Sequence, residues 1–410
     1  MEAKLKLPDV EARGEWARRA AYLGPGFLVG VGYIDPGNWA TDLEAGSRFG
    51  YELLWVILIS NLIGLVVQSF SARLGLVTGR SLAENCRYHF RPPVRWLVWL
   101  NAELALVATD LAEFMGAMLG FKLLLGVTNS VAIALSVGAA LGILALYRYG
   151  NRVVERVIIG LVGVVGLCYV IELLLVRPHW KAVLVGTLVP RLSHDSAATA
   201  SGILGATVMP HSLFLHSAIV RKEQYAQEGE QAIGATLFDL FVALNSAWLI
   251  NAAILATAAA AFFTRGHVVT SIEQAHATLA PLFGTRAAEI FAIGLLAAGV
   301  ASSTAATLTG QLVFEGFFGK QASLLLRRGI ALVPALAMII YGADPYLILI
   351  VSQIVLSVLI PFALVPLVVL CARASVMGEQ ANGVLGNTLA ITVTAVTLYF
   401  NGALLVSLLR

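Results

Sequence analysis

Long apolar stretches recur along the whole chain and are separated by short segments that carry most of the charges. About 20 apolar residues in a helix cross the ~30 Å hydrocarbon core of a bilayer, and a helix satisfies its own backbone polar groups, as lipid requires. The pattern therefore predicts eleven transmembrane helices, at residues 21–46, 53–77, 96–121, 130–147, 154–176, 198–220, 234–263, 286–314, 326–342, 345–371 and 385–409.

The composition excludes a water-soluble protein. Charged residues make up 12% of the 410 residues and apolar types 59%, whereas soluble domains carry about 25% and ~45–50% respectively. The net charge of +3 is too small to indicate a nucleic-acid partner. Cys86, Cys168 and Cys371 lie far apart without CxxC spacing, so neither a disulfide framework nor a thiolate metal site is indicated.

The basic residues predict the orientation of the chain in the membrane. Residues 1–20 are charged and lack the apolar core of a signal peptide, so we expect a cytoplasmic segment there. Cytoplasmic loops carry an excess of Lys and Arg, and with the N-terminus inside, 19 of the 27 Lys and Arg residues lie on the inner side. We therefore expect a multi-pass protein of the cell membrane with its C-terminus outside.

Two predicted spans contain helix-breaking sequences near their middle. Residues 30–38 read GVGYIDPGN, and residues 205–211 read GATVMPH. Pro36 and Pro210 lack an N–H donor and disfavour helix at the preceding residue. An ionisable side chain at mid-membrane depth, here Asp35, is costly and indicates a functional site.

The two breaks lie in the first helix of two predicted five-helix halves, 21–176 and 198–371, which the span 385–409 follows. Interrupted helices at corresponding positions are typical of inverted-repeat transporters, which bind their substrates near the membrane midplane. Two ordinary proline kinks, which membrane helices tolerate, are the alternative. The polar and sulfur-bearing residues at the breaks favour the binding site.

These residues suit a divalent metal ion. Asp35 offers a carboxylate oxygen, Asn38 a carbonyl oxygen and Met209 a thioether, while Ala206, one turn before Met209, can offer a freed backbone carbonyl. A carboxylate alone would suit sodium, calcium or magnesium. The thioether favours softer metals such as manganese, iron and cadmium.

The third span carries three acids, Glu103, Asp110 and Glu113, whose spacings of seven and three place them along one helix face. Acids within a membrane are costly unless they are paired, hydrated or protonated. We interpret the stripe as a proton relay leading from the metal site. A structural ion-pair network is the alternative, compatible with the first, and its partners would be Arg73, Arg327 or Arg328.

Other ionisable residues are less informative. His211 could be a ligand, a proton acceptor or a hydrogen-bonded core histidine; we favour proton linkage or conformational coupling, and a structural role for His216. Glu172, Asp239 and Glu289 lie near the predicted span ends, where we expect their charges to reach headgroups or water.

At these residues the chain resembles the Nramp family (natural resistance-associated macrophage proteins), which are proton-coupled divalent-metal transporters. The resemblance rests on DPGN at 35–38 and MPH at 209–211, and it extends through TDLAEF at 109–114 and SQIVLS at 352–357. It covers nearly the whole chain, from about Leu23 to the last helix. Ser212 departs from several members, but it neighbours the ligands and is not one.

The resemblance implies a LeuT-like inverted repeat of five plus five transmembrane helices with an eleventh helix, in which helices 1 and 6 are interrupted. It implies that the metal is held by Asp35, Asn38, the carbonyl of Ala206 and the sulfur of Met209, with Gln353 joining in some conformations.

The resemblance also implies the activity, which is symport of manganese or ferrous iron, and also of cadmium, into the cytoplasm with protons by alternating access. Asp110 and Glu113 match family residues implicated in proton transfer, and the arginines of the ninth span are their expected partners. The whole predicted proton pathway comprises Asp35, His211, Asp110, Glu113, Glu103, Arg327 and Arg328.

Three other functions were weighed against this one. A related magnesium transporter is the strongest, because Asp35 and Asn38 alone could serve a hydrated hard ion, although magnesium-carrying relatives depart at ligand positions that this chain keeps. In a LeuT-like amino-acid symporter, Asp35 would repel the substrate carboxylate. A membrane enzyme has little support, since the sequence has no HExxH motif and no Walker loop. We expect no resident cofactor, nucleotide or nucleic-acid partner, and only metal ions, protons and the lipid bilayer.

Overall fold

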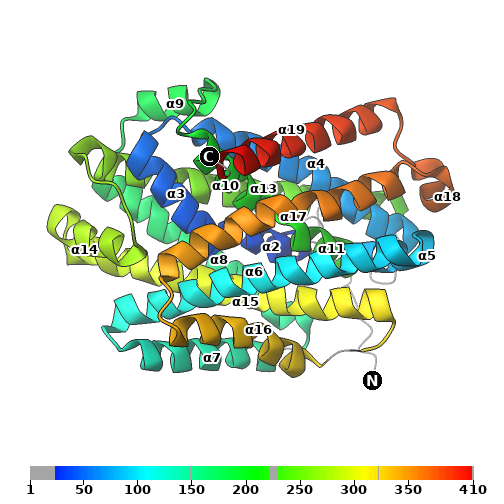
Figure 1. The fold of residues 1–410 in the computed structure, drawn as a ribbon, viewed down its shortest axis with the longest axis horizontal. Coiled ribbons are helices and arrows are strands. Elements are labelled where there is room, and N and C mark those ends of the chain that lie inside the picture. Colours follow the sequence, from blue (N-terminus) through cyan, green and yellow to red (C-terminus); the bar gives the residue numbers. More distant parts are fainter. Residues whose placement is uncertain (1–23, 147–148, 222–228, 322, 409–410) are drawn as a thin grey trace, which may run out of the picture.

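The computed structural model describes residues 24–146, 149–221, 229–321 and 323–408, and within these ranges every regular element is helical. The predicted cytoplasmic segment 1–20 lies outside the described residues. A helix or a pair of half-helices lies at each of the eleven predicted spans (Figure 1). In the described part of the chain, nine of these spans, the divided sixth span among them, are long and apolar enough to cross a membrane.

Nine spans are uninterrupted, and their bounds differ from the predicted ones by a few residues. They are α4 (Leu54–Thr78), α6 (Pro92–Leu125), α7 (Asn129–Leu146), α8 (Asn151–Val176), α13 (Gly229–Ala261), α15 (Thr285–Phe318), α16 (Leu324–Ile340), α17 (Pro345–Cys371) and α19 (Val384–Leu408). The first predicted span is divided into α2 (Pro25–Gly30), the 3₁₀ turn η1 (Val31–Ile34) and α3 (Pro36–Phe49). The sixth is divided into α10 (Ala197–Thr207) and α11 (Pro210–Ile219).

Short helices in the connections lie at the two ends of the bundle. At one end lie α5 (Leu82–His89) and α18 (Ala374–Met377), followed by η4 (Gly378–Gln380); at the other lie α9 (Trp180–Leu188) and α14 (Ile272–Phe283), which η3 (Phe263–Arg265) precedes (Figure 1). The first pair falls in segments predicted to be inside and the second in segments predicted to be outside. The connections therefore separate as the predicted alternation of spans requires.

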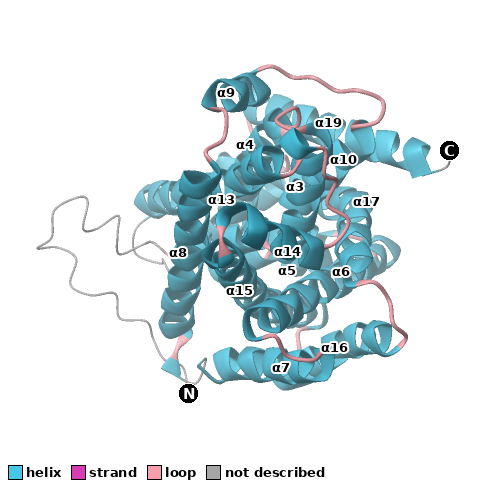
Figure 2. Ribbon diagram, turned by 90° about the vertical axis from the view of Figure 1, so that its left-hand side faces the viewer, coloured by secondary structure: helices cyan, strands magenta, loops and turns pink. Residues whose placement is uncertain are grey.

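The divided helices lie in the interior, whereas α7 and α16 lie at the periphery (Figure 2). Small residues allow close approach between the inner helices. A Cβ added to Gly299 of α15 would come 2.5 Å from the backbone nitrogen of Ala117 in α6. Gly116 faces the ring of Pro36 in the same way, so α6 packs directly against the break of the first span.

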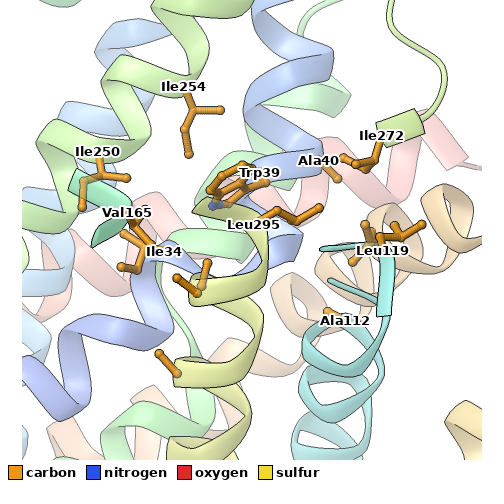
Figure 3. Close-up of a cluster of buried hydrophobic side chains, with 14 of the residues drawn as sticks. Ile34, Trp39, Ala40, Ala112, Leu119, Val165, Ile250, Ile254, Ile272 and Leu295 are labelled. Atoms are coloured by element: carbon orange, nitrogen blue, oxygen red, sulfur yellow. The ribbon is translucent and has the colours of Figure 1, made fainter. Parts of the chain in front are cut away.

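Trp39, one residue after the DPGN sequence, is the centre of the largest apolar cluster (Figure 3). Its ring is fully buried and makes edge contacts with Tyr169, at a centroid distance of 4.9 Å, and with Phe291, at 5.4 Å. Aromatic pairs in this geometry contribute about 0.5–1.5 kcal/mol beyond their buried area. This packing joins α3 to α8 and α15, and holds the start of α3 in place.

Candidate metal-binding site

Asp35 caps the second half of the broken first span. Its backbone is extended (φ −67°, ψ 164°), Pro36 occupies the first helical position, and its Oδ1 accepts a 2.9 Å hydrogen bond from the backbone N–H of Asn38. The sequence produces this geometry because Pro36 excludes helix at Asp35, while an aspartate at the N-cap satisfies a free N–H of the first turn. The carboxylate is completely buried.

Asn38 connects the two broken spans. Its Nδ2 donates to Asp35 Oδ1 at 2.7 Å and to the backbone carbonyl of Ala206 at 3.1 Å. Ala206 lies in the last turn of α10, where the following Val208 and Met209 leave the helix and Pro210 supplies no N–H. The structure therefore brings residues 35, 38 and 206 together, as the sequence led us to expect, and their role as metal ligands stays a prediction.

Met209 and Gln353 complete the surroundings. Met209 is fully buried at the N-cap of α11, and its sulfur lies 3.6 Å from the position that a Cβ on Gly32 would take. The amide of Gln353 in α17 covers Gly37, where any side chain would collide with it. Because Gly37 has none, Gln353 reaches the DPGN turn.

Two oxygens at this site have no hydrogen-bond partner within the described residues, namely Asp35 Oδ2 and Gln353 Oε1. Both are buried, and such groups are costly unless a ligand satisfies them. No group of three or more His, Cys, Asp or Glu side chains suited to a metal occurs in the described parts of the chain. A metal bound here would therefore meet one carboxylate and otherwise neutral oxygen and sulfur donors.

A polar network behind the breaks was not predicted from the sequence. Gln68 of α4 donates to Ser212 Oγ at 2.7 Å and to the Tyr33 hydroxyl at 3.2 Å, and its Oε1 contacts His216 Nδ1 at 3.1 Å. Asn251 of α13 donates to the carbonyl of Tyr33 at 2.6 Å, which satisfies a backbone group freed by the break. The available sequence signal was the presence of amide side chains within largely apolar spans, Gln68 in 53–77 and Asn251 in 234–263. His216 has the structural role that we predicted.

The predicted proton pathway is brought together in part. Glu103 forms a 2.7 Å ion pair with Arg327, and Asp110 and Glu113 are buried in α6. His211 Nδ1 lies 3.0 Å from Thr109 Oγ1, next to Asp110 in the sequence. The side chain of Arg328 lies outside the described residues.

Three sequence interpretations need correction. Arg73 donates to Asn382 Oδ1 and to the carbonyl of Gln380, and so binds the connection before α19 instead of the acidic stripe. Asp239 and Glu172 are buried by the surrounding helices and do not reach headgroups. Asp239 accepts hydrogen bonds from the backbone N–H groups of residues 24 and 26, where it caps α2. Glu289 is exposed, as predicted.

Residues 26–407 match the family model described as natural resistance-associated macrophage protein-like. The chain belongs to the Nramp family. It is 43% identical over 388 residues to the divalent metal cation transporter MntH of Caldanaerobacter subterraneus subsp. tengcongensis, a match that covers 94% of this chain and 92% of the relative. Full-length similarity at this level includes both broken spans.

Solved structures show the same fold. A mutant of the Eremococcus coleocola manganese transporter superimposes with a TM-score of 0.84 at 30% identity, covering 95% of this chain and 87% of that chain. MhsT in complex with L-phenylalanine matches with a TM-score of 0.61 at 14% identity, covering 94% of this chain and 97% of that chain, which shows similarity of fold alone. This Nramp chain is thus an all-helical, multi-pass membrane protein whose fold neighbours are LeuT-like.

Proposed function

We propose that this Nramp chain is a secondary transporter that carries divalent transition-metal ions, manganese and ferrous iron first and also cadmium, into the cytoplasm together with protons. The observation that carries this proposal is the junction of the two broken spans, where the Asn38 amide bridges the Asp35 carboxylate and the Ala206 carbonyl. The functions of the relatives, divalent metal cation transport and manganese transport, support it.

The proposed ligands are Asp35, Asn38, the Ala206 carbonyl and Met209, with Gln353, which reaches the DPGN turn, joining in some conformations. In the observed arrangement the NH₂ group of Asn38 faces the two oxygens that would bind the metal. Rotation of this amide would present its carbonyl oxygen instead. Metal binding would therefore exchange two hydrogen bonds for metal–oxygen contacts without moving either backbone.

The thioether sets the proposed selectivity. Asp35 and the carbonyl oxygens would accept magnesium or calcium as readily as manganese, whereas a thioether discriminates in favour of softer ions. A magnesium transporter is the competing function, and it would leave Met209 without a role as a ligand.

Protons complete the proposed cycle. A metal ion beside Asp35 favours the ionised carboxylate and expels its proton. The onward path would run by His211 and the α6 acids, Asp110 and Glu113, toward the Glu103–Arg327 pair and Arg328. We place this pair on the cytoplasmic side, with the N-terminus inside and the C-terminus outside, and we assign residues 21–176 and 198–371 to the two inverted repeats that alternate access to the site.

The experiment is uptake into proteoliposomes that contain a metal-sensitive dye or a pH-sensitive dye. We expect saturable uptake of manganese, iron and cadmium with internal acidification, and little uptake of magnesium or calcium. Magnesium uptake that exceeds manganese uptake would replace this function with its competitor, and metal entry without a proton flux would remove the coupling.

A further inference from the structure

A second group of buried acids lies apart from the metal site and from the α6 acids. Asp42 of α3 and Glu172 of α8 are each 1% exposed, and Tyr169 is 3% exposed. Four of their polar atoms have no hydrogen-bond partner within the described residues, namely Asp42 Oδ2, both carboxylate oxygens of Glu172 and the Tyr169 hydroxyl. An unsatisfied buried polar atom costs about 1–3 kcal/mol, so these groups require a ligand.

An aromatic contact between α3 and α8 places the three side chains near one another. Tyr169 lies edge-on against Trp39, three residues before Asp42, and Glu172 lies three residues after Tyr169. Residues three apart share a helix face, so each acid stands beside the aromatic contact. Both carboxylates lie within electrostatic range of the Tyr169 hydroxyl.

Within the described part of the chain, no basic side chain forms an ion pair with the acids of this cluster. None of the ion pairs found there includes Asp42 or Glu172. The groups that act on the cluster are Asp35, from the same helix as Asp42, and Cys168, beside Glu172.

An isolated carboxylate in such surroundings binds either a proton or a cation. The Tyr169 hydroxyl, within electrostatic range of both acids, favours the proton. A tyrosine hydroxyl can accept one proton and donate another. Tyr169 therefore has the chemistry needed between two carboxylic acids.

The position of the cluster indicates from which end of the bundle it would receive protons. Asp42 follows Asp35 by seven residues, which places it on the same face of α3 at roughly 10 Å along the axis. Glu172 is one turn from the end of α8 at Val176, and α9 begins shortly after it. The three groups thus lie between the metal site and the end of the bundle that carries α9 and α14 (Figure 1).

We propose that Glu172, Tyr169 and Asp42 form an outer proton-binding site that supplies protons to Asp35. This proposal rests on the proposed function and concerns the outer part of the proton route, between the outer side and Asp35, which the α6 acids do not cover. Glu172 takes a proton from the outer side and passes it to the Tyr169 oxygen, while the hydroxyl proton of Tyr169 passes to Asp42. None of these groups hydrogen-bonds another directly, so each transfer runs through a bridging water. Each transfer breaks one O–H bond and forms another, and the residues return to their starting state when Asp42 releases its proton toward Asp35.

The test uses full-length protein in liposomes with manganese as the probe, and measures initial manganese uptake and internal acidification at several external pH values. Glu172→Gln keeps the shape of the side chain and cannot exchange a proton. A positioned proton donor and acceptor typically contributes ~10²–10⁴-fold, so we expect the proton-to-manganese ratio to fall at least about tenfold. Manganese affinity in calorimetry should stay within about twofold of the wild type, because no proposed ligand changes.

Two further variants distinguish the outcomes. Tyr169→Phe removes only the hydroxyl and should lower the same ratio, which covers the case in which Glu172→Gln does not fold. Glu289→Gln, an exposed acid on the neighbouring α15, is the matched control and should keep the wild-type ratio. An unchanged proton-to-manganese ratio in both site variants overturns the proposal. Weakened manganese binding at a constant ratio also overturns it, because it would indicate that the cluster binds metal ions and not protons. Failure of the wild type to take up manganese would instead contradict the proposed function.

Discussion

Met209→Ala tests the chemical basis of the proposed selectivity. The Met209 side chain is fully buried, and its sulfur is the only one among the proposed ligands. Gly32 leaves room beside it, since a Cβ there would stand 3.6 Å from the sulfur and 3.8 Å from His211 Nε2. The substitution removes the thioether and leaves the carboxylate and carbonyl donors in place.

Two effects of this substitution must be separated. Truncation of a buried methionine to alanine costs about 2–5 kcal/mol of stability, and this loss is the same whichever metal is added. Loss of the thioether acts only on metals that bind sulfur. Even outer partners of metal ligands alter affinity by about 10–100-fold, so we expect cadmium affinity to fall by at least roughly this factor, while calcium affinity changes little.

The assay is isothermal titration of cadmium, manganese and calcium into the wild type, Met209→Ala and a control. Met118→Ala provides the control, because Met118 is also buried, in α6, and belongs to the apolar cluster. We expect the cadmium-to-calcium affinity ratio to fall in Met209→Ala alone. An unchanged ratio would show that the thioether packs the break and does not bind metal.

Two further predictions concern the proton path and the packing of α10. Glu113→Gln and Asp110→Asn keep shape but cannot ionise, so metal binding should survive while the proton flux per manganese ion falls in proteoliposomes; a wild-type ratio in both would make the acids structural. Gly205→Ala should lower thermal stability and manganese uptake, because its Cβ would stand 2.8 Å from the Gln353 carbonyl oxygen, and overpacking costs about 1–3 kcal/mol. Gly138→Ala, which would meet no atom within 4 Å, should leave both unchanged, and equal losses in the two variants would contradict the packing argument.

The positions of the spans could be predicted because lipid imposes one rule on every crossing segment, namely a long apolar helix. The breaks at Asp35-Pro36 and Met209-Pro210 could be predicted for a local reason, since proline constrains its own residue and the one before it. The meeting of Asn38 with Ala206 followed from the expected symmetry of two halves. For the spans and the breaks, the decisive information lies within a short segment of the chain.

Other features depend on which helices become neighbours, and this is not encoded locally. In the sequence, Gln68 is one of two amides in a largely apolar span, and only the packing of α4 on α11 shows that it joins Tyr33, Ser212 and His216. Glu172 was misplaced because the depth of a side chain near a helix end depends on what covers it. Here Glu172 is buried in a helix that packs against α15 and α13.

The most direct test of the metal site is manganese binding by Asp35→Ala. Asp35 carries the only formal negative charge among the proposed ligands, and all of the others are neutral. We expect calorimetry to detect no manganese binding by this variant, and normal binding by Asp195→Ala, which removes an exposed aspartate from the connection before α10. Manganese binding by Asp35→Ala with wild-type affinity would contradict a metal site at the two helix breaks.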